Sequence, residues 1–154
     1  MNTHYYFAYG MNTNISSMAS RCPAAVNLGY ARLLDYDFRF ATHADVKPLM
    51  NSYVDGVLWE ITDACLHSLD MLEGYPFYYD RTYAQVLTEN GIVDAIIYTM
   101  QPGNQDAPPA PSYFAMCLEG YDENMVPNGQ LLQALDGTEF DKKLDYVYNL
   151  ALNS

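Results

Sequence analysis

Basic residues are scarce in this sequence of 154 residues, which has 7 lysines and arginines against 19 aspartates and glutamates. The formal net charge of −12 opposes binding to nucleic acid and to anionic membrane surfaces, so we expect neither partner. No apolar run reaches the roughly 20 residues that span a membrane. The first residues also lack the basic and apolar regions of a secretory signal. We therefore expect a cytoplasmic protein.

Cysteine is equally rare, and Cys22, Cys65 and Cys117 are widely spaced, with no CxxC pattern. This usage is typical of a reducing compartment, and we expect free, mostly buried thiols. The GxGxxG pattern for dinucleotides and the GxSxG pattern for nucleophilic serines are both absent. His43 and Asp45 form only a weak metal-binding pair. We therefore expect neither a metal nor a cofactor.

Hydrophobic residues make up half of the sequence, and tyrosine is abundant at 15 residues. Tyrosine favours strands and half-buried surfaces, so we expect a substantial sheet. The length suits one domain, and neither an internal repeat nor a linker divides it. We expect a single domain over residues 1–154.

Alternating apolar and polar residues predict several strands. The expected strands cover residues 4–9, 30–41, 54–61, 78–88 and 92–100. Asn90 and Gly91 predict a hairpin between the last two strands. Residues 43–53 and 101–111 have the composition of loops, because both contain proline and several polar residues.

Helix signals are interspersed with these strands. One expected helix covers residues 15–21 after a cap at Asn14, and a second runs from a cap at Thr62 through Leu72. A third follows a cap at Ser112 and reaches Leu118 or Tyr121, and a fourth covers 129–150 with a break near Gly137. Gly74 is a good stop for the second helix. This order is not a regular βαβ alternation, and it predicts an α+β fold with a curved antiparallel or mixed sheet.

The first stretch with chemical potential is YFAYGMNTN, in which a strand ends abruptly at Gly10. Gly10 permits a positive φ, and successive N–H groups around residues 10–12 can converge on an anion. Tyr9 and Asn12 can add side-chain donors. The alternative is a plain strand end, since many strands finish with glycine and asparagine.

The second stretch is LDMLEGYPFYYDR, in which Glu73 closes a helix just before Gly74. A carboxylate at that end faces the negative pole of the helix dipole, and the aromatic side chains that follow can desolvate it. Both effects raise its pKa towards that of a general base. The alternative is a solvated glutamate. An ion pair between Asp70 and Arg81 would tie the helix to the next strand.

The segments FAYGMN, SRCP, GVLWEIT, LDMLEGYPFYYDR and PSYFAMCLEG, in this order, resemble the gamma-glutamylcyclotransferase-like family over about residues 4–127. This resemblance implies a small mixed β-barrel, or a strongly curved sheet, flanked by helices. It also implies an enzyme that converts a small gamma-glutamyl amine or peptide into 5-oxoproline and the free amine. Such a reaction needs no metal and no cofactor.

The resemblance also assigns roles to residues of this sequence. Glu73 corresponds to the catalytic acid/base of the family. The implied substrate-binding residues are Tyr9, Gly10, Met11, Asn12, Tyr79, Arg81 and Tyr113. Met11 departs from the family's usual serine, which leaves open a non-catalytic binding protein of the same fold. An acidic interaction protein without a pocket is a third reading. The leaving group and the oligomeric state are not set by the sequence.

Overall fold

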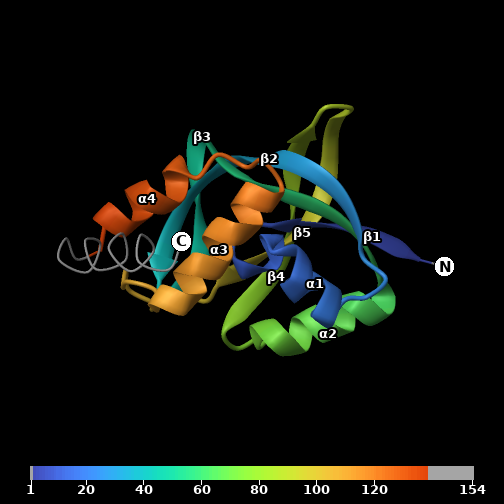
Figure 1. The fold of residues 1–154 in the computed structure, drawn as a ribbon, viewed down its shortest axis with the longest axis horizontal. Helices are drawn as coiled ribbons and strands as arrows, with labels where there is room; N and C mark the ends of the chain where they lie inside the picture. Colours follow the sequence, from blue (N-terminus) through green and yellow to red (C-terminus); the bar gives the residue numbers. More distant parts are fainter. Residues whose placement is uncertain (1, 139–154) are drawn as a thin grey trace.

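The computed structural model of the protein describes residues 2–138, and its centre is a closed barrel in the order β1-β3-β2-β4-β5 (Figure 1). The strands are β1 (Thr3–Ala8), β2 (Val26–Ala41), β3 (His43–Thr62), β4 (Tyr79–Thr88) and β5 (Gly91–Met100). All neighbours pair antiparallel except β1 and β5, which pair in parallel at Tyr6 and Ile96. The barrel is therefore mixed, and the predicted fold class is confirmed.

The longest feature of the barrel is the hairpin of β2 and β3, which stay paired from Val26 and Glu60 to Ala41 and His43. The predicted loop over residues 43–53 is therefore wrong, because β3 runs through all of it. Pro48 lies opposite Tyr36, next to a register shift between Leu34 and Tyr36. Such an irregularity accommodates a proline, which cannot donate to the ladder.

Two predicted helix starts are confirmed by their caps. The side chain of Asn14 accepts from the N–H of Ser17 before α1 (Ile15–Arg21), and Thr62 accepts from Cys65 before α2 (Asp63–Glu73). These caps satisfy backbone donors that have no partner within the helix. The short 3-10 helix η1 (Met11–Thr13) links β1 to α1.

The start predicted for the third helix is wrong, since α3 (Pro111–Glu123) begins with a proline and extends beyond Tyr121. Proline suits the first helical position because its missing N–H is not needed there. The helix α4 (Gly129–Asp136) ends just before Gly137, and the remainder of the expected 129–150 helix lies outside the described residues. Between residues 2 and 138, no helix is long and apolar enough to cross a membrane.

The end of β1 is buried on both faces. Tyr6, Phe7, Ala8 and Tyr9 are all buried, whereas Tyr5, nearer the start of the strand, is 37% exposed. A strand is buried on both sides where one face lines a barrel core and the other is covered by further elements. Figure 1 shows α1, α2 and α3 on the same side of the barrel, around the end of β1.

A disulfide joins Cys22 to Cys65, whose Cα atoms are 5.1 Å apart. The expectation of three free thiols is therefore wrong, and the cysteine pattern no longer argues for a reducing compartment. Cys22 caps the end of α1, and Cys65 lies in the first turn of α2, so the bond fixes these helices to each other. Cys117 is free and buried.

We predict that reducing the disulfide lowers the free energy of unfolding by about 4 kcal/mol, because the bond closes a loop of 43 residues in the unfolded chain. Denaturant unfolding with and without reductant measures this difference. Alkylation of the unfolded, unreduced protein provides the control. One added group is expected at Cys117, whereas three would contradict the disulfide.

Candidate active site

A cavity of about 170 Å³ opens beside the end of β1, between the barrel and the helices. It is smaller than the usual pocket for a drug-sized ligand, so it suits a small chemical group. Its walls come from β1, the start of β3, β4 and β5 of the barrel, and from η1, α1, α2 and α3. The lining residues are Tyr6, Phe7, Tyr9, Gly10, Met11, Asn12, Arg21, His43, Ala44, Leu72, Glu73, Tyr78, Tyr79, Tyr98 and Tyr113.

A larger hollow of about 680 Å³ lies elsewhere, between the β2–β3 hairpin and α4. The arginine in its wall, Arg39, is already held by Asp45 at 2.8 Å and by Asp106 at 3.0 Å. The smaller cavity is the stronger candidate because its polar groups converge and one of them has a strongly perturbed pKa.

Glu73 supplies the carboxyl group of the smaller cavity from the last residue of α2. The next residue, Gly74, adopts the left-handed conformation with φ 65° and ends the helix there, as predicted. The side chain of Glu73 is half-buried, so the solvated alternative does not apply. Its Oε1 atom accepts a hydrogen bond of 3.4 Å from Nδ2 of Asn12.

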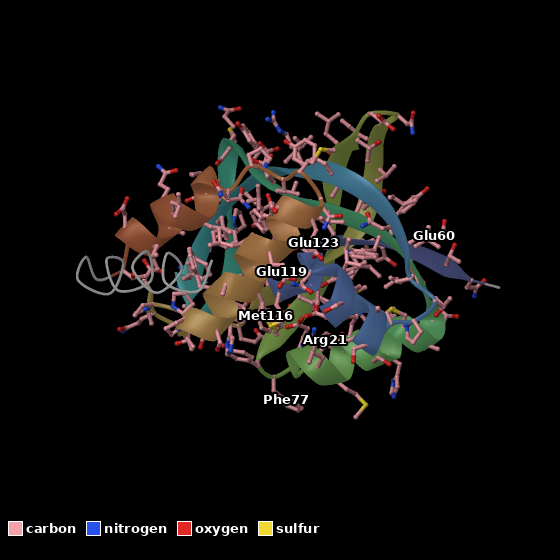
Figure 2. All side chains as sticks on the ribbon, in the orientation of Figure 1. Arg21, Glu60, Phe77, Met116, Glu119 and Glu123 are labelled. Atoms are coloured by element: carbon pink, nitrogen blue, oxygen red, sulfur yellow. A yellow bond between two sulfur atoms is a disulfide. The ribbon has the colours of Figure 1, made fainter. Side chains whose placement is uncertain are left out.

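Burial raises the pKa of Glu73 to about 7, and the positive charge of Arg21 acts in the opposite direction. The expected desolvation therefore occurs, although not from every aromatic residue that follows the helix. Tyr78 and Tyr79 line the cavity. Phe77 points outward and is 89% exposed (Figure 2). A carboxyl group with this pKa can both accept and return a proton near neutral pH.

The loop of residues 9–12 forms the wall next to Glu73. Gly10 has a φ of −118°, so the expected positive φ is wrong. Glycine is needed for space instead, because a Cβ atom there would lie 3.0 Å from both Ala44 Cβ and the hydroxyl of Tyr113. Within residues 2–138 the N–H groups of residues 10–12 donate no hydrogen bond. These donors are therefore available to a ligand.

The two side-chain donors predicted in this loop differ in what they bind. The hydroxyl of Tyr9 donates to the carbonyl of Tyr98 at 2.6 Å, so its proton is already used. Asn12 donates through Nδ2 to the hydroxyl of Tyr6 at 3.0 Å, in addition to Glu73. Its Oδ1 atom is buried and has no partner in the described part of the chain. A buried acceptor of this kind is costly unless a ligand or water satisfies it.

Tyr79 and Tyr113 line the cavity as expected and hold Ala44 between them. Tyr79 donates to the carbonyl of Ala44 at 2.7 Å, and the hydroxyl of Tyr113 accepts from the N–H of Ala44 at 3.1 Å. Arg81 does not line the cavity. Its guanidinium pairs with Asp70 and lies over the ring of Tyr75. The predicted tie between α2 and β4 is therefore confirmed.

Sequence reasoning missed several residues that the fold brings to the cavity: Arg21, Tyr6, His43 and Tyr98. Arg21 lies at the end of α1, beside α2 (Figure 2). The only sequence signal for it was the SRCP segment. His43 lies 2.9 Å from the hydroxyl of Tyr78 through Nδ1, while Asp45 is buried against Arg39. Residues 2–138 contain no cluster of three metal-ligating side chains.

Comparison with known proteins gives a consistent result. A family model described as "Gamma-glutamyl cyclotransferase, AIG2-like" matches residues 6–115. The gamma-glutamylcyclotransferase of Mus musculus is 28% identical over 157 residues, which cover 92% of this chain and 84% of the relative. That of Homo sapiens is 27% identical over 154 residues, covering 90% and 82%. A solved structure named "Gamma-glutamyl cyclotransferase" has a TM-score of 0.78 at 28% identity, covering 90% of this chain and 89% of that one.

We predict that Glu73→Gln stabilises the protein at pH 8 by roughly 1–3 kcal/mol and has a several-fold smaller effect at pH 5. The raised pKa of Glu73 means that the folded state binds this proton more tightly than the unfolded state does. The free energy of unfolding therefore falls as the pH rises from the unfolded-state pKa of 4.5 through about 7. The neutral amide removes this loss.

Denaturant unfolding at both pH values measures the difference. Glu60→Gln is the matched control, because Glu60 lies outside the cavity (Figure 2). Equal stability of wild type and Glu73→Gln at pH 8 would contradict the burial of this carboxylate.

Proposed function

We propose that this chain, which belongs to the gamma-glutamyl cyclotransferase, AIG2-like family, converts a small gamma-glutamyl amine or peptide into 5-oxoproline and the free amine. The observation that carries this proposal is the half-buried carboxyl of Glu73, placed in one cavity wall with the loop of residues 9–12. The names of the relatives support the same reaction class.

The reaction is an intramolecular acyl transfer. The α-amine of the substrate attacks its own γ-carbonyl carbon, a new C–N bond closes the five-membered lactam, and the bond to the leaving nitrogen breaks. α-Amines are largely protonated near neutral pH, so a base must take a proton before or during the attack. The leaving nitrogen must gain a proton. A substrate folded within a small cavity gains further from the proximity of its two reacting groups.

Glu73 is proposed to carry this proton as general base and then as general acid. A carboxyl group with a pKa of about 7 exchanges a proton readily in both directions at neutral pH. The side chain of Asn12 contacts Glu73 through Nδ2, and its unpartnered Oδ1 atom is suited to accept a hydrogen bond from an N–H of the attacking amine. Asn12 would thereby orient the nucleophile towards its base.

The backbone of residues 10–12 is proposed to bind the oxygen atoms of the glutamyl group. Free N–H groups at the start of a short helix can stabilise the oxyanion that forms on the γ-carbonyl. In this role Met11 replaces the family's serine without loss, because only its backbone contacts the substrate. Tyr9 contributes its ring to the wall, since its hydroxyl is already bonded to Tyr98.

The remaining predicted binding residues have two kinds of proposed role. Tyr79 and Tyr113 shape the cavity and fix Ala44 opposite Gly10. Arg81 acts from outside the cavity through Asp70, which lies one turn before Glu73 on α2. Tyr98 also donates to Asp70, at 2.7 Å, so this carboxylate joins β4, β5 and α2.

We predict release of 5-oxoproline from at least one member of a panel of gamma-glutamyl amines, peptides and amino acids. Glu73→Gln should lower kcat by about 100-fold or more, because it removes the group that transfers the proton. Mass spectrometry of the reaction mixture measures the product. Glu60→Gln, which alters a carboxylate outside the cavity, should retain wild-type turnover.

Failure of the wild type to release 5-oxoproline from any compound would contradict the enzymatic proposal. Calorimetric binding of 5-oxoproline without turnover would instead favour a non-catalytic binding protein. Met11 is the observation that favours this second function, because it occupies the position of the family serine.

A further inference from the structure

We propose that Arg21 binds the α-carboxylate of the glutamyl group, so that the site selects gamma-glutamyl compounds whose α-carboxylate is free. This inference rests on the proposed function and assigns a substrate contact to a residue that it does not use. Arg21 contributes to the cavity wall from the last turn of α1. A planar guanidinium matches the two oxygens of a carboxylate.

Arg21 differs from the other three arginines of the chain because no carboxylate within residues 2–138 forms an ion pair with it. In the described residues, its guanidinium forms neither an ion pair nor a hydrogen bond. The others are satisfied: Arg32 pairs with Asp55, Arg39 with Asp45 and Asp106, and Arg81 with Asp70. In a protein with a net charge of −12, a half-buried arginine that has no ion-pair partner among the described residues indicates that an anionic ligand pairs with its guanidinium.

The opposite charges of Arg21 and Glu73 lie in the same cavity but do not pair directly. A ligand that carries both an amine and a carboxylate on one carbon fits between them. Its amine would face Glu73 and Asn12, and its carboxylate would face Arg21. This arrangement leaves the N–H groups of residues 10–12 for the γ-carbonyl, where charge develops during the reaction.

The backbone holds this pair of charges in place through the disulfide. Arg21 is followed directly by Cys22, which is bonded to Cys65 in α2, and Glu73 is the last residue of the same helix. The two charged groups therefore belong to elements that cannot separate without breaking a covalent bond. Such preorganisation lowers the cost of ordering a binding site.

A purely structural role for Arg21 makes a different prediction. A cation near the end of a helix stabilises the helix dipole whether or not a ligand is present. In that case the loss of Arg21 would lower stability without changing the preference between a carboxylate and an amide. The experiment must therefore measure this preference rather than activity alone.

The test compares two ligand pairs that differ only at the α-position. For turnover, the pair is an active gamma-glutamyl compound from the panel and its α-carboxamide. For binding by calorimetry, the pair is 5-oxoproline and 5-oxoprolinamide. Neither compound carries a leaving group, so this comparison does not depend on the choice of leaving group. Wild type should prefer the carboxylate by about 10- to 100-fold in kcat/KM and in Kd, the range expected for a charge-assisted hydrogen bond.

Arg21→Gln should reduce this preference to within about threefold, and Arg21→Lys should restore part of it. Lys47→Gln is the matched control for the loss of one positive charge, because Lys47 is exposed and outside the cavity, and it should keep the wild-type preference. The comparison within wild type needs no variant to fold.

The inference on Arg21 is overturned if wild type treats carboxylate and amide alike, or if Arg21→Gln keeps the full preference. Release of 5-oxoproline in either case leaves the proposed function intact. A preference that depends on Arg21 in the binding assay, without turnover of any compound, supports the inference and contradicts the enzyme.

Discussion

The burial of one carboxyl group, that of Glu73, is the constraint on which the proposed site depends. The helix α2 must end at this residue, and Gly74 makes the end possible because it adopts a left-handed conformation. The barrel then provides the apolar wall that raises the pKa of Glu73. Without that wall, the same glutamate would be an ordinary solvated side chain with no tendency to exchange protons at neutral pH.

The architecture brings separate parts of the chain to this carboxyl group. The end of β1 supplies the loop of residues 9–12, and the start of β3 supplies Ala44, which Tyr79 and Tyr113 hold by its two backbone groups. Asp70 connects α2 to the barrel through Arg81 and Tyr98. The disulfide connects α2 to α1 on the other side. Glu73 is thus held from both ends of its helix.

The sequence predicted those features that depend on neighbouring residues. The caps at Asn14 and Thr62 and the stop at Gly74 are local, because each involves a side chain and a backbone group within a few positions. The resemblance to a family added the barrel and the importance of Glu73. The turn after β1 was also predicted from the sequence, but the reason for Gly10 was not, since its close neighbours Ala44 and Tyr113 are distant in sequence.

The features that sequence reasoning missed are those set by long-range pairing. The strand β3 continues through residues 43–53 because β2 pairs with it, although Pro48 suggested a loop. Cys22 can bond to Cys65, and Arg21 can line the cavity, only when α1 packs against α2. The most direct test of the central claim is a carbon-detected NMR titration of the Glu73 carboxyl group. The account predicts a pKa of about 7, and a value near the ordinary 4.5 would contradict it.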